Sequence, residues 1–191
     1  RSRRGLVLPE PTAYPVLPLA EAVADLLQWD PDDELAIVAA DAPLKQGTIT
    51  LPELAALLTP SRFDTGRRRL AMASTRSRSP IETLARLRLR AAGLEVDEGV
   101  VIRGVGEIDL VVNGWLIVEL DGFDYHSDMW SLEQDDSRSR DVARLGLTLI
   151  RFTGRQVRSG RFVAEVLAVV AAHPHATRLI PRGAGPFTLS R

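Results

Sequence analysis

The chain of 191 residues contains no cysteine, and Lys45 is its only lysine. The absence of cysteine excludes disulfide bonds and metal sites built from thiolates. It also suits the reducing cytoplasm, so we expect a cytoplasmic location. All the other basic side chains are arginines. Their planar guanidinium group suits two-point contact with phosphate, although an arginine bias also arises from genome composition.

Long hydrophobic runs are absent as well. The longest apolar stretch near the C-terminus, Phe162–Ala172, is too short to span a bilayer and contains Glu165. Residues 1–11 lack the apolar core of a signal peptide. Net charge is -1, with 45% hydrophobic and 26% charged residues, which is typical of a globular protein. Composition therefore predicts a protein with no membrane partner.

Arginine is concentrated in one part of the chain, residues 62–90. This stretch holds nine arginines against two acidic residues. The arginines are Arg62, Arg67, Arg68, Arg69, Arg76, Arg78, Arg86, Arg88 and Arg90. A local basic stretch in a neutral protein is typical of a surface that contacts nucleic acid. A solvated linker is the alternative interpretation.

The first part of the chain predicts a helical module. Residues 1–18 carry four prolines and predict an extended arm. Apolar spacing and capping signals, among them Thr50, predict four helices in residues 19–75. These helices are Leu19–Trp29, Asp33–Leu44, Pro52–Leu58 and Arg67–Ser74. The module contains no catalytic set, and we assign it residues 1–78.

The second part predicts a helix, three strands, a helix, a strand and a helix. Ser79, Pro80 and Glu82 form a helix start that runs to Ala92, so capping alone is one explanation of Glu82. The later elements are strands 94–102, 105–112 and 115–120, helix 130–145, strand 147–152 and helix 161–172. This order predicts an α/β domain with a central sheet over residues 79–172, followed by an irregular tail, residues 173–191.

Carboxylates interrupt two of these apolar strands. Asn113-Gly114 predicts a hairpin turn between them, since both residues tolerate positive φ. Asp109 lies before the turn, and Glu119 and Asp121 lie after it. Burying a carboxylate is costly unless it is paired or binds a metal. A divalent cation held by oxygen ligands is the simplest explanation.

The length of the hairpin loop decides whether these acids meet. A two-residue loop would direct Asp109 and Glu119 to opposite faces of the sheet. A three-residue loop, Val112–Gly114, would pair Asp109 with Ile117 and bring the acids to one face. A metal site therefore requires an odd loop or a bulge.

With Glu82, Asp109 and Glu119-Leu120-Asp121 in this order of elements, the chain resembles the PD-(D/E)XK nuclease superfamily. The runs VELDGFDYH (118–126), RSRD (138–141) and LTLIRFT (147–153) resemble a branch related to very-short-patch mismatch-repair endonucleases. The resemblance covers residues 79–158. Residues 19–75 are also similar to the helical segment of abortive-infection antitoxin-like proteins.

The resemblance implies a restriction-endonuclease-like mixed sheet flanked by helices and an Mg²⁺-dependent DNA endonuclease, with Mn²⁺ as a substitute. It implies that Glu82 holds a metal-bound water and that His126 is a general acid or base. The position of the family's usual lysine holds Asp121. The implied metal ligands are Asp109, Glu119, Asp121 and the backbone carbonyl of Leu120.

DNA is the expected partner, and the helical module is expected to position DNA or a protein. The residues expected to contact DNA are Arg67, Arg68, Arg69, Arg86, Arg90, Tyr125 and Trp130. Packing is the alternative role of the two aromatic residues. The alternative function is a non-catalytic DNA-binding or antitoxin-like regulator with a degenerate nuclease domain. The substrate remains open among intact duplex, mismatched DNA, branched DNA and an R-loop.

Overall fold

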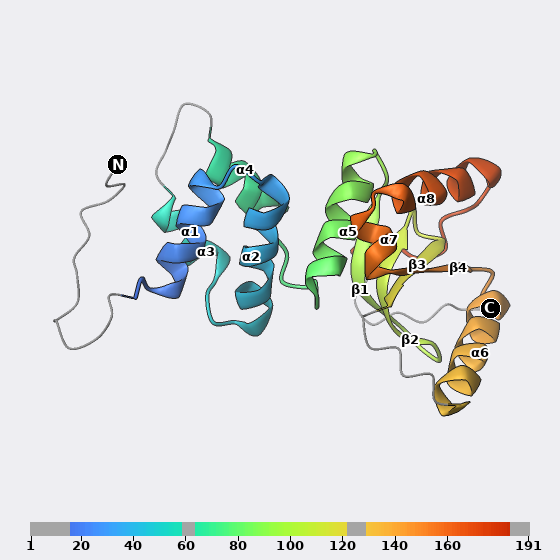
Figure 1. Cartoon of the computed structure of the whole chain (residues 1–191). Helices are drawn as coiled ribbons and strands as arrows, with labels where there is room; N and C mark the ends of the chain where they lie inside the picture. Colours follow the sequence, from blue (N-terminus) through green and yellow to red (C-terminus); the bar gives the residue numbers. More distant parts are fainter. Residues whose placement is uncertain (1–15, 59–63, 122–128, 184–191) are drawn as a thin grey trace.

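A computed structural model describes residues 16–58, 64–121 and 129–183, and Figure 1 shows how their elements are arranged. This part of the chain forms eight helices and one four-stranded sheet. None of these helices has the length and apolar character needed to cross a membrane.

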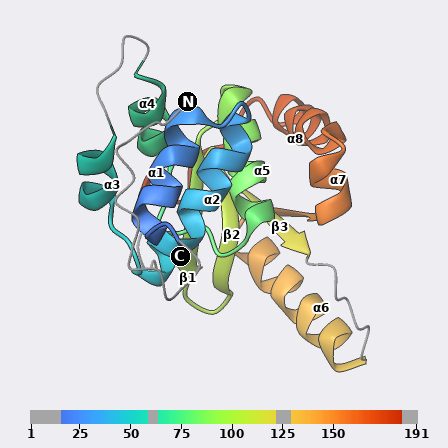
Figure 2. The same ribbon diagram turned by 60° about the vertical axis from the view of Figure 1, so that its left-hand side comes forward.

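The first four helices form a group with its own hydrophobic cluster (Figure 2). They are α1 (Leu19–Trp29), α2 (Asp33–Gln46), α3 (Leu51–Leu57) and α4 (Thr65–Met72). Local capping explains where α2 and α3 begin: Asp32 accepts a hydrogen bond from the N–H of Leu35, and Thr50 forms a capping box with Glu53. The four predicted helices are confirmed, with α2 extended to Gln46.

The rest of the chain builds the sheet and the helices that cover it. Its elements are α5 (Pro80–Ala91), β1 (Val96–Ile102), β2 (Gly106–Val112), β3 (Leu116–Asp121), α6 (Met129–Arg144), β4 (Thr148–Thr153), α7 (Gly154–Arg158) and α8 (Arg161–Ala172). The sheet order is β1-β2-β3-β4, with β4 parallel to β3 and the other pairs antiparallel. The predicted α/β class is confirmed, while α7 was not predicted.

The hairpin between β2 and β3 has a three-residue loop, Asn113–Trp115, and Val112 lies opposite Leu116. The odd loop that a metal site requires is therefore present. The predicted loop residues were wrong, because the loop begins one residue later. Extending the observed register places Asp109 opposite Glu119 rather than Ile117, so both acids leave the same face of the sheet.

Position 114 in the hairpin loop has no room for a side chain. Its φ is +74°, and a Cβ atom there would lie 2.7 Å from the carbonyl oxygen of Ile180. The backbone N–H groups of Leu179 and Ile180 donate to the Gly114 carbonyl at 2.9 and 2.8 Å. The segment after α8 is irregular as far as Gly183, as predicted, but it packs tightly on the hairpin loop.

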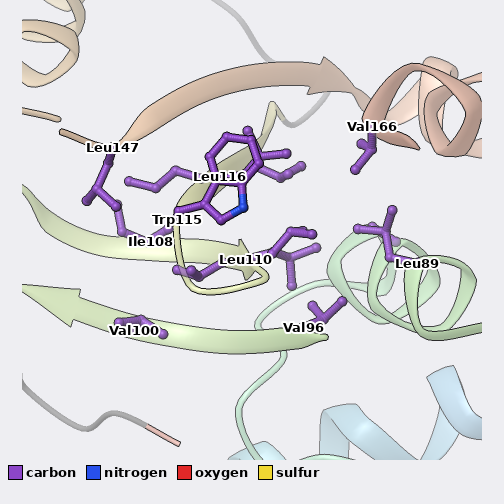
Figure 3. Close-up of a cluster of buried hydrophobic side chains, with 14 of the residues drawn as sticks. Leu89, Val96, Val100, Ile108, Leu110, Trp115, Leu116, Leu147 and Val166 are labelled. Atoms are coloured by element: carbon purple, nitrogen blue, oxygen red, sulfur yellow. The ribbon is translucent and has the colours of Figure 1, made fainter. Parts of the chain in front are cut away.

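The larger hydrophobic core is built around the sheet and includes side chains from both of its faces; Figure 3 shows part of it. Each of the first three strands directs a fully buried side chain to the same face of the sheet. These side chains are Val100 of β1, Ile108 of β2 and Leu116 of β3. Leu89 of α5 and Val166 of α8 belong to the same cluster (Figure 3). Burial of these side chains is the main source of stability for the sheet.

A buried ion pair network joins the helical module to the sheet. Arg86 of α5 is fully buried and donates to Asp41 of α2 at 2.6 Å. Its Nε atom lies 3.1 Å from Glu98 of β1. Asp41 also accepts from the Thr83 hydroxyl and the Ser74 N–H, each at 2.7 Å. One guanidinium therefore balances two buried carboxylates from different parts of the fold.

Arg86→Ala should lower the free energy of unfolding by about 3–5 kcal/mol, because Asp41 and Glu98 would remain buried without their partner. Urea denaturation measures the change. Arg67→Ala is the control, since the Arg67 side chain is 48% exposed and its removal should change stability by less than about 0.5 kcal/mol. A decrease below about 1 kcal/mol in Arg86→Ala would contradict the role of this network.

Candidate functional site

Carboxylates converge at the end of the sheet where β2 begins and β3 ends. β2 supplies Glu107 and Asp109, and β3 supplies Glu119 and Asp121 on the same face. The first turn of α5 adds the buried Glu82. The two strands are antiparallel, so acids that are distant in sequence meet at the same end of the sheet.

Arg78, just before α5, contacts three of these carboxylates. Its guanidinium lies 3.0 Å from Glu107 and 3.8 Å from Glu82, and it forms a closer ion pair with Asp109. Its backbone N–H donates to Glu82 at 2.8 Å. Burial opposes its charge, but Glu82, Asp109 and Glu107 outweigh burial and raise the pKa of Arg78.

Gly99 lies next to Glu107 and to the segment before α5. Gly99 is in the edge strand β1 and has a φ of +57°. A Cβ atom there would already contact Glu107 Oε1 at 3.6 Å and the Arg76 carbonyl oxygen at 3.7 Å. The segment before α5 is held on β1 by Ser77, whose hydroxyl donates to Glu98 at 2.7 Å.

Arg138 of α6 approaches the site from the other side. It donates to the Glu119 carboxylate at 2.6 Å and also to the Glu107 carbonyl oxygen. Arg151 of β4 lies beside Glu119 because the two residues are register partners in the parallel pair. Asp109 accepts a hydrogen bond from the Leu120 N–H at 2.8 Å, which fixes its orientation against β3.

Two of the acids, Glu82 and Glu119, have raised pKa values. Burial, opposed by the Arg78 N–H and reinforced by Asp109, raises the pKa of Glu82. Burial likewise raises the pKa of Glu119, with Arg138 opposing the shift and Asp109 adding to it. The coupling of Asp109 to both residues shows that the three carboxylates share one electrostatic environment. An additional positive charge there would be favourable.

The carboxylate oxygens are hard donors of the kind that Mg²⁺ prefers. The residues therefore fit a magnesium ion by their chemistry. Among the described residues, however, no group of three or more His, Cys, Asp or Glu side chains is arranged to hold a metal ion. In this conformation the carboxylates point at Arg78 and Arg138, so a cation would have to compete with these arginines.

The structure thus brings together Glu82, Asp109 and Glu119 of the predicted site. Asp121 is the last residue of β3 and shares their face. Leu120, the predicted carbonyl ligand, contacts Asp109 through its N–H group. Glu82 also serves the helix start, because its own N–H donates to Ser79 at 3.2 Å. The helix-start role is therefore present, and the carboxylate still faces the site.

The predicted aromatic and histidine contributions lie outside the described residues. They are Tyr125, His126 and the side chain of Trp130. Conversely, sequence reasoning did not place Arg78 and Arg138 in the site. A useful signal was that three acids in apolar strands require counter-charges when no metal is bound.

The arginines of residues 62–90 do not form one surface, and this corrects the predicted DNA contacts of Arg69 and Arg86. Arg86 is buried in the network with Asp41. Arg69 is also buried: it pairs with Asp33 and donates to carbonyl oxygens at the end of α1. Neither guanidinium is accessible to a phosphate group.

The other arginines of this stretch differ in their surroundings. Arg88 pairs with Glu34 at 2.8 Å. Arg90 donates to the Val96 carbonyl oxygen at 2.7 Å, and burial lowers its pKa. Arg67 and Arg68 are exposed on α4. For Arg67, Arg68 and Arg90 the expected contact with DNA stays a prediction.

Comparisons with protein-family models, with curated proteins and with solved structures find no match to this chain.

Glu119→Gln should flatten the dependence of stability on pH. Since the pKa of Glu119 in the folded state is above its usual value of 4.5, the folded protein keeps a proton that the unfolded chain has released. This stabilisation is complete below pH 4.5 and disappears as the pH rises through the folded-state pKa. Glutamine does not ionise, so this part of the decline should vanish.

Urea denaturation in EDTA over about pH 4–8 measures this effect. Glu165→Gln is the matched control, because Glu165 is exposed on α8. It should keep the decline of the original protein. An equal decline in Glu119→Gln and in the control would show that Glu119 does not carry the effect.

Proposed function

We propose that the chain is an Mg²⁺-dependent DNA endonuclease with a restriction-endonuclease-like fold. One observation carries the proposal: Asp109 and Glu119 leave the same face of adjacent strands, with Glu82 coupled to Asp109 from the first turn of α5. The raised pKa values of two of these acids show that the arrangement costs stability. Such a cost is expected where acids serve chemistry.

Asp109, Glu119 and Asp121 would hold the metal ion. When bound, Mg²⁺ would polarise the phosphate group and lower the pKa of a bound water molecule. Glu82, with its raised pKa, is suited to accept a proton from the attacking water. Arg151 is the cation on β4 next to Glu119. It would provide the positive charge for the phosphate that a lysine provides in the resembled family.

A specific observation favours a second candidate, the non-catalytic DNA-binding regulator. Arg78 and Arg138 form ion pairs with Glu107, Asp109 and Glu119 within the protein. These ion pairs give the three acids cationic partners without a metal ion. In a regulator these arginines would remain bound to the acids, and the protein would bind DNA without cleaving it.

Asp109→Asn should reduce Mg²⁺-dependent cleavage to the level seen in EDTA, because the metal would be deprived of a charged ligand. Asparagine keeps an oxygen that accepts from the Leu120 N–H, so the fold should persist. Nicking of plasmid and cleavage of intact, mismatched and branched duplexes measure the activity. DNA affinity should stay within a few-fold of the original, which fluorescence anisotropy measures.

Asp141→Asn is the control, since Asp141 pairs only with Arg144 on the surface of α6 in the described structure. It should cleave at the original rate. If the unmodified protein binds DNA but cleaves none of these substrates with Mg²⁺ or Mn²⁺, the regulator replaces the nuclease.

A further inference from the structure

α7 and the turn after it carry a second group of arginines, which follows residues 62–90 in the sequence and contacts that stretch through Arg88. Residues 154–161 contain Arg155, Arg158 and Arg161 and no acidic residue. All three side chains are exposed. The protein as a whole has a net charge of -1, so this concentration of positive charge is local.

The surface begins beside the carboxylate site. β4 runs parallel to β3, and its last residue, Thr153, is the register partner of Asp121. α7 starts at the next residue, Gly154. A Cβ atom at Gly154 would lie 3.3 Å from Ile81, and Ile81 directly precedes Glu82. The start of α7 is therefore packed between the end of β3 and the first turn of α5.

α7 is held firmly in this place (Figure 1). Thr153 and Gln156 form a capping box, in which Gln156 accepts from the Thr153 N–H at 2.8 Å. Val157 is fully buried, and its carbonyl oxygen accepts from Arg88 of α5 at 2.7 Å. Arginines on so fixed an element lose little further backbone freedom when they bind a ligand.

In the described structure, nearby acids leave the charges of Arg155 and Arg161 uncompensated. Glu34 is paired with Arg88. Glu165 follows Arg161 by one turn of α8 but forms no ion pair with it in the described structure. Neither Arg155 nor Arg161 has a carboxylate partner in the part of the chain that the structure describes. The ligand that suits this surface is a polyanion.

We propose that Arg155 and Arg161 bind phosphate groups of the DNA backbone next to the carboxylate site. The inference rests on the proposed function and names the surface along which the DNA lies. The phosphates of the duplex form a regular row of negative charges. Arg155 on the fixed α7 and Arg161 at the start of α8 would fix the position of the duplex without reading its sequence.

The test uses Arg155→Gln/Arg161→Gln in the full chain. Binding of a fluorescent duplex is measured by anisotropy in EDTA at several salt concentrations. The slope of log affinity against log salt should fall by about 0.9 for each phosphate group that the variant no longer binds, which is about 1.8 for the pair. The decrease should be the same for unrelated duplex sequences.

Arg144→Gln/Arg182→Gln is the matched control. Both side chains are mostly exposed, 66% and 71%, and both pair with carboxylates near the opposite end of the sheet. The control removes the same charge and should keep the original slope. A smaller slope in the control as well would assign the effect to net charge and overturn the inference.

Two other results would also overturn it. One is an unchanged slope in Arg155→Gln/Arg161→Gln. The other is absence of duplex binding in EDTA together with arginine-dependent binding of poly-glutamate, which would indicate an acidic protein partner. Failure of the nuclease proposal looks different, because the unmodified protein would then bind duplex with the full slope but cleave nothing in Mg²⁺.

Discussion

Compensation of buried carboxylates by arginine is the constraint on which this structure depends. Arg86 balances Asp41 and Glu98 where the helical module meets the sheet. Arg78 and Arg138 perform the same task at the cluster around Asp109. A guanidinium group has several donors in one plane, so a single side chain can satisfy carboxylates from different elements. The same chemistry thus fixes both the junction of the two parts and the candidate site.

Local signals in the sequence predicted most of the fold. Helix starts at Thr50 and Ser79 depend on residues three positions apart, and the strands depend on alternation, so both can be read without tertiary information. The hairpin was harder, because two-residue and three-residue loops share the same Asn113-Gly114 signal. Its register depends on the Gly114 carbonyl, which binds a segment more than sixty residues away. α7 was missed although Thr153 and Gln156 have the spacing of a capping box.

The acids of the candidate site could be predicted from the sequence, but its arginines could not. Strand parity alone indicated that Asp109 and Glu119 would meet on one face if the loop were odd. The arginine-rich stretch misled because neighbours in sequence face different surroundings around a helix. Arg86 is buried on α5 beside Leu89, whereas Arg88 lies on the other side of the helix and pairs with Glu34. The buried partner of Arg86 comes from α2, and a sequence pattern does not reveal such a partner.

The contact between Gly114 and the segment after α8 affects where this fold can be divided. Residues 177–183 add no strand, yet Ile180 is fully buried and two N–H groups hold the hairpin loop. Removing this segment would leave every helix and strand present while releasing the turn that sets the alignment of β2 with β3. The smallest autonomous unit therefore has to extend to Gly183. Residues 177–183 hold the hairpin loop, and this loop aligns the two strands that bring the acids together.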